Sequence, residues 1–151
     1  PAMLPLSSRS SVEPLRYHDF QLRAYSVQAF GKRIEFDLVF RAPDSDWFDS
    51  RITFSDVVCY RFTHPSAAII TEIDEVELQS LVSEEASDLT NMACHYGLTH
   101  WRRGGSIADY TDALQRELIR AWRIESAIGF EGFVIAKNVV GQCTSVPRDR
   151  P

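Results

Sequence analysis

The alternation of side chains between residues 33 and 41 limits the fold more than any other feature of this chain. Apolar residues occupy every second position, and their neighbours are mostly charged. A period of two is typical of a β-strand with one buried face. The preceding run, residues 20–30, is also strand-like, and Gly31 and Lys32 separate the two runs. The pattern therefore predicts a hairpin of two antiparallel strands.

A third strand begins at Ile52 and continues to Phe62, but its alternation slips by one residue near Ser55 and Asp56. A slip of one residue would turn every later side chain to the opposite face of the sheet. A β-bulge is the economical explanation, and it places both Phe54 and Val57 towards the core. A short fourth strand is expected at residues 68–73.

Residues 78–96 are expected to form a helix, with Asp74 as its N-cap and Gly97 as the left-handed residue that ends it. Ser106 and Asp109 have the spacing of a capping box that opens a second helix. The first helix is predicted from apolar residues at steps of three and four, which are Leu78, Leu81, Val82, Ala86, Leu89, Met92, Ala93 and Tyr96.

The period of two returns near Arg120, and the turn 129–132 leads into a last, largely apolar strand at 133–140. The order of elements is thus four strands, two helices and two strands. This order predicts an α+β fold, a mainly antiparallel sheet of about six strands with the two helices packed on one face.

The chain has 151 residues, which is the usual size of one domain. Prolines and serines without periodicity make residues 1–14 an expected flexible leader. Residues 15–141 are expected to form the single domain, and residues 142–151 a polar tail.

Three cysteines, Cys59, Cys94 and Cys143, are an odd number without a Cys-x-x-Cys pair. Free thiols in a reducing compartment are the expectation. No apolar run approaches the ~20 residues that span a bilayer, and no secretion signal opens the chain. The sequence therefore predicts a cytoplasmic protein that has no membrane partner.

Acidic residues are concentrated in the middle of the chain, whose net charge is −5. Residues 42–101 contain two basic residues, Arg51 and Arg61, against eleven acidic ones. Such a surface repels phosphate backbones, so nucleic acid is not an expected partner. A basic protein is the natural complement.

Two acidic segments are the candidate partner-binding surfaces: the outer face of the first helix and the loop before the third strand. A solvated helix face that only keeps the protein soluble is the alternative for the first segment. In the loop, an aromatic ring either docks on the core or anchors a partner. The candidate residues are Asp44, Asp46, Trp47, Asp49, Glu84, Glu85 and Asp88.

Candidate catalytic and metal-binding residues are few. The doublet His18 and Asp19 is of the kind that binds metal in phosphohydrolases, but it stands at a strand start, where local capping explains it. Cys94, His95 and His100 do not have the spacing of a ligand set. No metal and no cofactor is expected. A small enzyme or ligand-binding domain that uses His18, Asp19 and the loop 102–105 is the alternative function.

Three stretches of the chain together resemble a known group of proteins: Tyr-His-Asp-Phe at 17–20, Arg-Ile-Thr-Phe-Ser-Asp-Val at 51–57, and the pair of segments 123–130 and 133–137. They resemble small bacterial single-domain proteins, some of which are grouped with the immunity proteins of polymorphic or secreted toxin systems. The resemblance spans about residues 17–140. It implies a non-enzymatic protein that neutralises a cognate toxin, here a basic one, by binding it, without catalytic residues.

Overall fold

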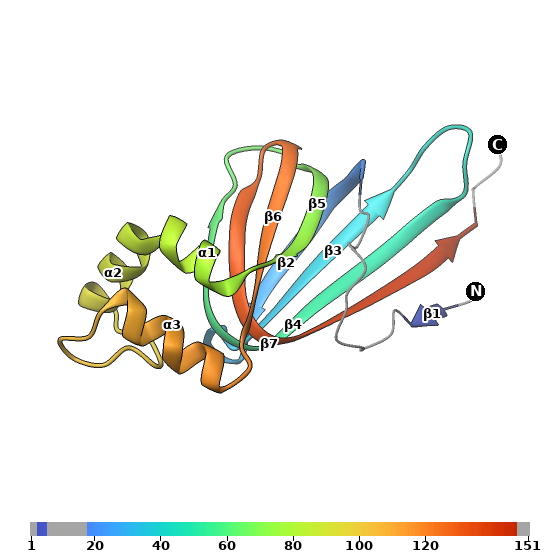
Figure 1. Ribbon diagram of the computed structural model, residues 1–151. Helices are drawn as coiled ribbons and strands as arrows, with labels where there is room; N and C mark the ends of the chain where they lie inside the picture. Colours follow the sequence, from blue (N-terminus) through green and yellow to red (C-terminus); the bar gives the residue numbers. More distant parts are fainter. Residues whose placement is uncertain (1–2, 6–17, 148–151) are drawn as a thin grey trace.

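The computed structural model describes residues 3–5 and 18–147 (Figure 1). The expected leader at residues 1–14 lies outside the described residues except for 3–5. The elements in chain order are β1 (Met3–Pro5), β2 (Phe20–Gln28), the 3₁₀ turn η1 (Ala29–Gly31), β3 (Arg33–Phe40), β4 (Trp47–Thr63), β5 (Ile69–Val76), α1 (Leu78–Glu84), α2 (Ala86–His95), α3 (Ile107–Arg116), β6 (Arg120–Ile128) and β7 (Glu131–Val146).

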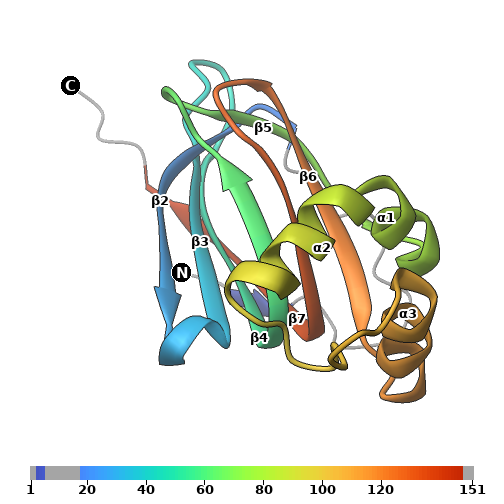
Figure 2. The ribbon, with the colours of Figure 1, turned by 90° about the vertical axis from the view of Figure 1, so that its left-hand side faces the viewer.

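The strands form a closed antiparallel barrel. Their order is β1-β7-β4-β3-β2-β5-β6, and β7 pairs with β6 as well as with β4. This pairing joins the two ends of a six-stranded sheet into a barrel, with β1 added beside the far end of β7. Figure 2 shows the strands wrapping around a common interior. The closure is completed by a short contact between β2 and β5 at Phe20 and Gln21.

The predicted α+β sheet with two helices on one face is therefore wrong. The protein is mostly β, with three helices outside a barrel. The physical reason lies in β7, where all five residues from Gly132 to Ala136 are buried. One side of this segment faces the barrel interior and the other side faces the helices. Both sides are buried, so the segment lacks the alternation of apolar and polar residues that marks a strand with one exposed face.

The barrel interior is filled by aromatic and aliphatic side chains that alternate along each strand. The ring centroids of Phe36 and Phe54 are 6.0 Å apart, and those of Phe54 and Trp122 are 5.3 Å apart. Tyr25 meets Phe36 at 5.8 Å. The fully buried members of this interior core include Ile34, Leu38, Ile52, Ile70 and Val134.

A second core lies between the helices and the outer side of β4, β7 and β6. Leu81, Val82 and Leu89 from α1 and α2 pack there with Tyr110 and Leu114 from α3. The strands contribute outward-facing side chains, which are Cys59, Ala121, Phe133 and Ile135. Burial raises the pKa of the Cys59 thiol to about 12, so this cysteine is a neutral apolar group.

The expected bulge in the third strand is confirmed. Asp56 has a φ of 51°, and Phe54 and Val57 both belong to the interior core. The register of β4 against β7 shifts just beyond this point, between Val57 and Cys59, which turns Cys59 to the helix side. The original alternation then returns, so Phe62 packs against the interior core.

The capping box of the second predicted helix is confirmed. The Asp109 amide donates to Ser106 Oγ at 3.2 Å, and the Ser106 amide donates to the Asp109 carboxylate at 3.3 Å. Gly97 has the expected left-handed φ, 74°. The single helix expected over 78–96 is instead two helices, broken at Glu85, and its N-cap is Glu77 because Asp74 belongs to β5.

The last strand continues five residues past Gly141, into the segment expected to be a polar tail. Residues 142–146 pair with the start of β4, and three of them also pair with β1. Among the described residues, no helix has both the length and the apolar character needed to cross a membrane.

Replacing Phe54 by alanine should lower the free energy of unfolding by about 3–5 kcal/mol, because the ring is fully buried between Phe36 and Trp122. Urea denaturation measures the loss. Val140→Ala, at a partly exposed position of β7, should change stability by no more than about 0.5 kcal/mol. A loss below about 1 kcal/mol for Phe54→Ala would contradict its place in the barrel interior.

Candidate functional site

Two arginines face the helices from the outer side of the barrel. Arg61 on β4 and Arg123 on β6 are both paired in register with Phe133 on β7, so the three residues form one row across three strands. The Arg61 guanidinium lies 5.2 Å from the centre of the Phe133 ring. This row brings two positive charges to the place where α1 meets α2.

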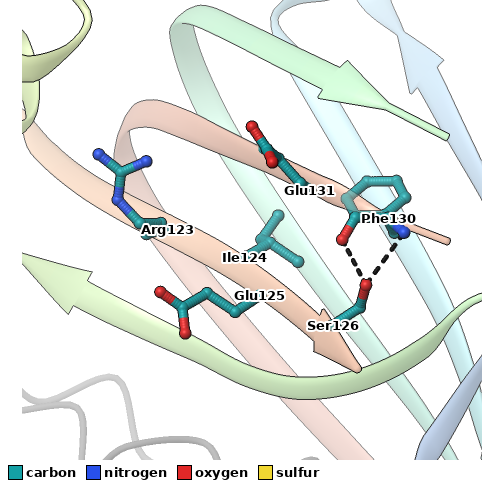
Figure 3. Close-up of a pocket in the computed structure, with 7 residues that line it drawn as sticks. Arg123, Ile124, Glu125, Ser126, Phe130 and Glu131 are labelled. Carbon is teal, nitrogen blue, oxygen red and sulfur yellow. Dashed lines mark hydrogen bonds between the residues drawn. The ribbon is translucent and has the colours of Figure 1, made fainter. Parts of the chain in front are cut away.

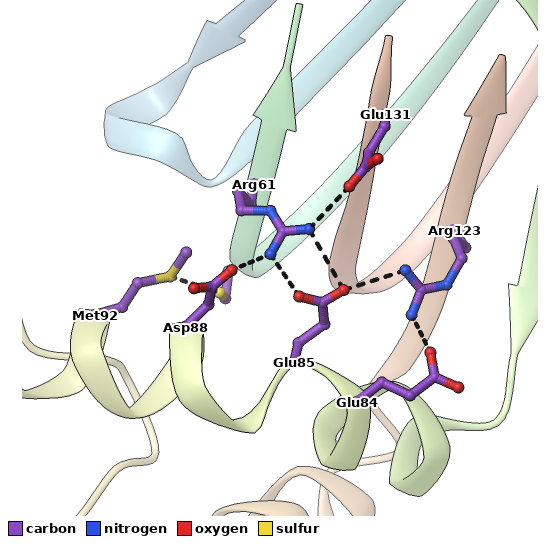
Figure 4. Close-up of polar contacts among 8 residues, drawn as sticks. Arg61, Glu84, Glu85, Asp88, Met92, Arg123 and Glu131 are labelled. Carbon is purple, nitrogen blue, oxygen red and sulfur yellow. Dashed lines mark hydrogen bonds and ion pairs between the residues drawn. The ribbon is translucent and has the colours of Figure 1, made fainter.

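Glu85, at the break between α1 and α2, bridges the two arginines (Figure 4). One carboxylate oxygen accepts from Arg61 Nη1 at 2.5 Å, and the other accepts from Arg123 Nη1 at 3.2 Å. Asp88 also pairs with Arg61, and Glu84 pairs with Arg123 at 2.5 Å. The break between α1 and α2 therefore places the Glu85 carboxylate where it can accept hydrogen bonds from arginines of both strands.

Burial lowers the pKa of Arg61, but the hydrogen bonds and charges of Glu85 and Asp88 outweigh burial and raise this pKa above its ordinary value. Arg61 thus stays charged inside a half-buried network. Its Nε atom has no hydrogen-bond partner among the described residues.

The acidic residues expected on the first helix are thus partly neutralised by the chain itself. The Glu85 side chain is only 12% exposed, while those of Glu84 and Asp88 are 64% and 50% exposed. Sequence reasoning missed the two arginines as partners, because Arg61 and Arg123 lie far from the helix in sequence. Only the outer parts of Glu84 and Asp88 remain available to another molecule.

The acidic loop before β4 lies at the far end of the barrel from the helices (Figure 1). Trp47 is half-buried there, with its indole N–H donating to the Ala42 carbonyl at 3.2 Å and the Arg41 guanidinium 5.3 Å from its ring. Asp49 pairs with Arg41, and it lies 3.8 Å from Arg23. Asp44 and Asp46 are exposed. The structure does not bring this loop together with Glu84, Glu85 and Asp88.

A second group of carboxylates, missed at the sequence level, lies on the outer side of β5 and β6. Glu72 and Glu125 are directly paired across the two strands. The interaction of Asp74 with protonated Glu72, the negative charge of Asp74, slight desolvation and the charge of Glu125 raise the pKa of Glu72, and the charge of His18 opposes them. Neither Glu72 nor Glu125 forms an ion pair with any arginine or lysine in the described part of the chain.

Glu125 also lines a hollow of about 340 Å³ where β6 and β7 diverge (Figure 3). The turn beneath the hollow is held by Ser126, whose hydroxyl accepts from the Phe130 amide at 3.0 Å and donates to the Phe130 carbonyl. Arg123 and Glu131 line the hollow as well. We call the carboxylates beside this hollow that form no ion pair with an arginine or lysine in the described part of the chain the acidic surface; they are Glu72, Asp74 and Glu125.

The residues of the alternative enzyme site are not brought together. His18 and Asp19 are exposed, 3.7 Å apart, and precede the start of β2. The loop 102–105 follows α2, whose last turn shares a groove with the opposite end of β2. His100 is held at 2.6 Å from Glu117. Within residues 3–5 and 18–147, no cluster of three or more His, Cys, Asp or Glu side chains is placed to hold a metal ion.

Glu85→Ala should lower the free energy of unfolding by about 1.5–3 kcal/mol, because two half-buried guanidinium groups lose the carboxylate that they share. Glu84→Ala is the matched control, since its carboxylate is mostly exposed, and should cost less than about 1 kcal/mol. Urea denaturation of both variants makes the comparison. Equal losses would show that Glu85 does not act as a bridge.

No protein-family model matches the chain, and it matches no curated protein and no solved structure. The function proposed below therefore depends on the geometry and charge of the chain's own residues.

Proposed function

We propose that this chain is a non-enzymatic binding protein whose acidic surface contacts a basic protein partner. An immunity-type inhibitor, which neutralises a basic toxin by direct contact, is the form of this function that fits the resemblance described above. The observation that carries the proposal is the pair Glu72 and Glu125, two like charges placed opposite each other on neighbouring strands.

Like charges directly opposite in an antiparallel pair destabilise a sheet. Asp74, two residues along the same strand, adds a third carboxylate, and the raised pKa of Glu72 reflects this crowding. A cationic side chain placed between these groups would relieve the repulsion. The unfavourable arrangement in the free protein thus becomes favourable in a complex with a lysine or arginine of a partner.

The neighbouring arginines do not supply this compensation. Arg61 pairs with Glu85 and Asp88 and, at 3.5 Å, with Glu131, while Arg123 pairs with Glu84 and Glu85. The acidic surface therefore keeps a negative potential, which speeds the association of positively charged proteins and repels nucleic acid.

Replacing Glu72 by glutamine should change how stability depends on pH. A carboxyl group whose pKa is raised by folding favours the folded state at low pH, and this contribution disappears as the pH rises through the raised value. The wild-type protein should therefore lose part of its stability as the pH rises from about 4.5, the ordinary pKa of glutamate. Urea midpoints measured from pH 4 to 8 should fall less for Glu72→Gln. If the urea midpoints of the two proteins depend on pH in the same way, the neighbouring carboxylates do not raise the pKa of Glu72.

Glu125→Lys should raise the urea midpoint of the free protein, because lysine opposite Glu72 forms an attractive pair. The same substitution should slow association with the basic partner by about fivefold or more at low salt, and the difference should shrink as ionic strength rises. The partner is first co-purified from the native host and identified by mass spectrometry, and its binding is then measured by surface plasmon resonance.

Asp112→Lys, a charge reversal at an exposed position of α3, is the control and should leave association within about twofold of the wild type. Because Glu125→Lys is expected to be more stable and yet to bind more slowly, misfolding cannot produce the expected pair of results. Unchanged association of Glu125→Lys would place the interface elsewhere.

A further inference from the structure

A groove of about 600 Å³, lined mostly by apolar residues, lies beside the C-terminal end of α2. One wall is formed by Met92, Tyr96 and Leu98, and the floor by residues 57–60 of β4. The opposite wall is formed by Val27 and the turn η1. Tyr96 and Val27 are both exposed to solvent. The groove shares no residue with the acidic surface.

Phe30 stands at the rim of this groove, and its side chain is fully exposed. Ala29, Phe30 and Gly31 have φ values of 51°, 57° and 86°, so three successive residues are left-handed. Only the last is a glycine, and a bulky residue is strongly disfavoured in this conformation. The turn thus holds the Phe30 ring in water by an unfavourable backbone conformation. Burial of this ring by another molecule would be favourable, because it removes apolar surface from water.

Lys32 is the charged residue among those that line the groove, and it forms no ion pair with any described residue. Its ammonium group next to apolar walls selects an occupant that combines apolar side chains with a negative charge. The groove therefore favours a negatively charged partner, whereas the acidic surface favours a positively charged one.

We propose that this groove is a second interaction surface, which binds a segment of a partner protein that carries apolar side chains and at least one carboxylate. The inference is independent of the function proposed for the acidic surface. A second copy of this chain is disfavoured as the occupant because a two-fold dimer through the groove would bring two Lys32 ammonium groups together. A small ligand is disfavoured because pockets for such ligands enclose them, whereas the Phe30 ring projects freely.

Nuclear magnetic resonance titration of the full chain tests the proposal with two peptides. The first, acetyl-Leu-Asp-Leu-Asp-Leu-amide, supplies apolar side chains and carboxylates, and the second replaces each aspartate with the isosteric asparagine. We expect the aspartate peptide to shift the amide signals of Gly31, Lys32, Tyr96 and Leu98, and to bind about fivefold or more tightly than the asparagine peptide.

The chain contains two lysines, Lys32 and Lys137, which provide a matched pair of variants. Lys32→Gln should abolish the preference for the aspartate peptide, while Lys137→Gln, at an exposed position of β7, should keep it. Phe30→Asn should weaken both peptides by about tenfold, as loss of an aromatic anchor does. Asparagine tolerates the left-handed conformation, so this variant should be at least as stable to urea as the wild type.

Three results would overturn the proposal. The first is that neither peptide shifts the groove signals, or that both bind equally to the wild type. The second is a wild-type dimer in sedimentation velocity that Phe30→Asn dissociates, which would assign the groove to a second copy of the chain. The third is displacement of the peptide by laurate at equal or lower concentration, which would assign it to a small apolar acid.

Discussion

The pairing of β7 with both β4 and β6 is the constraint on which the rest of the structure depends. It converts an open sheet into a barrel and buries β7 on two sides, so one strand supports both the aromatic interior and the core beneath the helices. The closure is tight at Gly132, where a Cβ atom would lie 2.3 Å from the Arg61 carbonyl oxygen. A side chain at this position would push β7 away from β4 and open the barrel beside the row of Arg61, Phe133 and Arg123.

The helices are attached to this barrel by two different kinds of contact. Apolar side chains such as Leu81 and Leu89 supply most of the burial, which is not directional. The ion pairs of Glu85 are directional, and they fix which turn of the helical segment faces which strand. The carboxylates left outside, around Glu72 and Glu125, are the ones free to act on another molecule.

Local features of the fold could be predicted from the sequence, and non-local ones could not. The alternation at 33–41, the bulge near Asp56 and the capping box of Ser106 depend on neighbours within a few residues, and the structure contains all three. Barrel closure depends on strands that meet across long stretches of chain, and no periodicity states which edges pair. The same limit applies to the site. Glu84, Glu85 and Asp88 could be recognised as acidic residues from the sequence. Their pairing with Arg61 and Arg123, and the position of Glu72 opposite Glu125, arise only when the chain folds.

The bridge at Glu85 also has an evolutionary consequence. Because a single carboxylate is divided between Arg61 and Arg123, the effect of changing one arginine depends on the state of the other. Loss of one guanidinium leaves Glu85 free to pair fully with the other, whereas loss of both leaves a mostly buried carboxylate without a charged partner. Positions 61, 85 and 123 therefore form one epistatic unit, and in a lineage of this chain they should drift together or not at all.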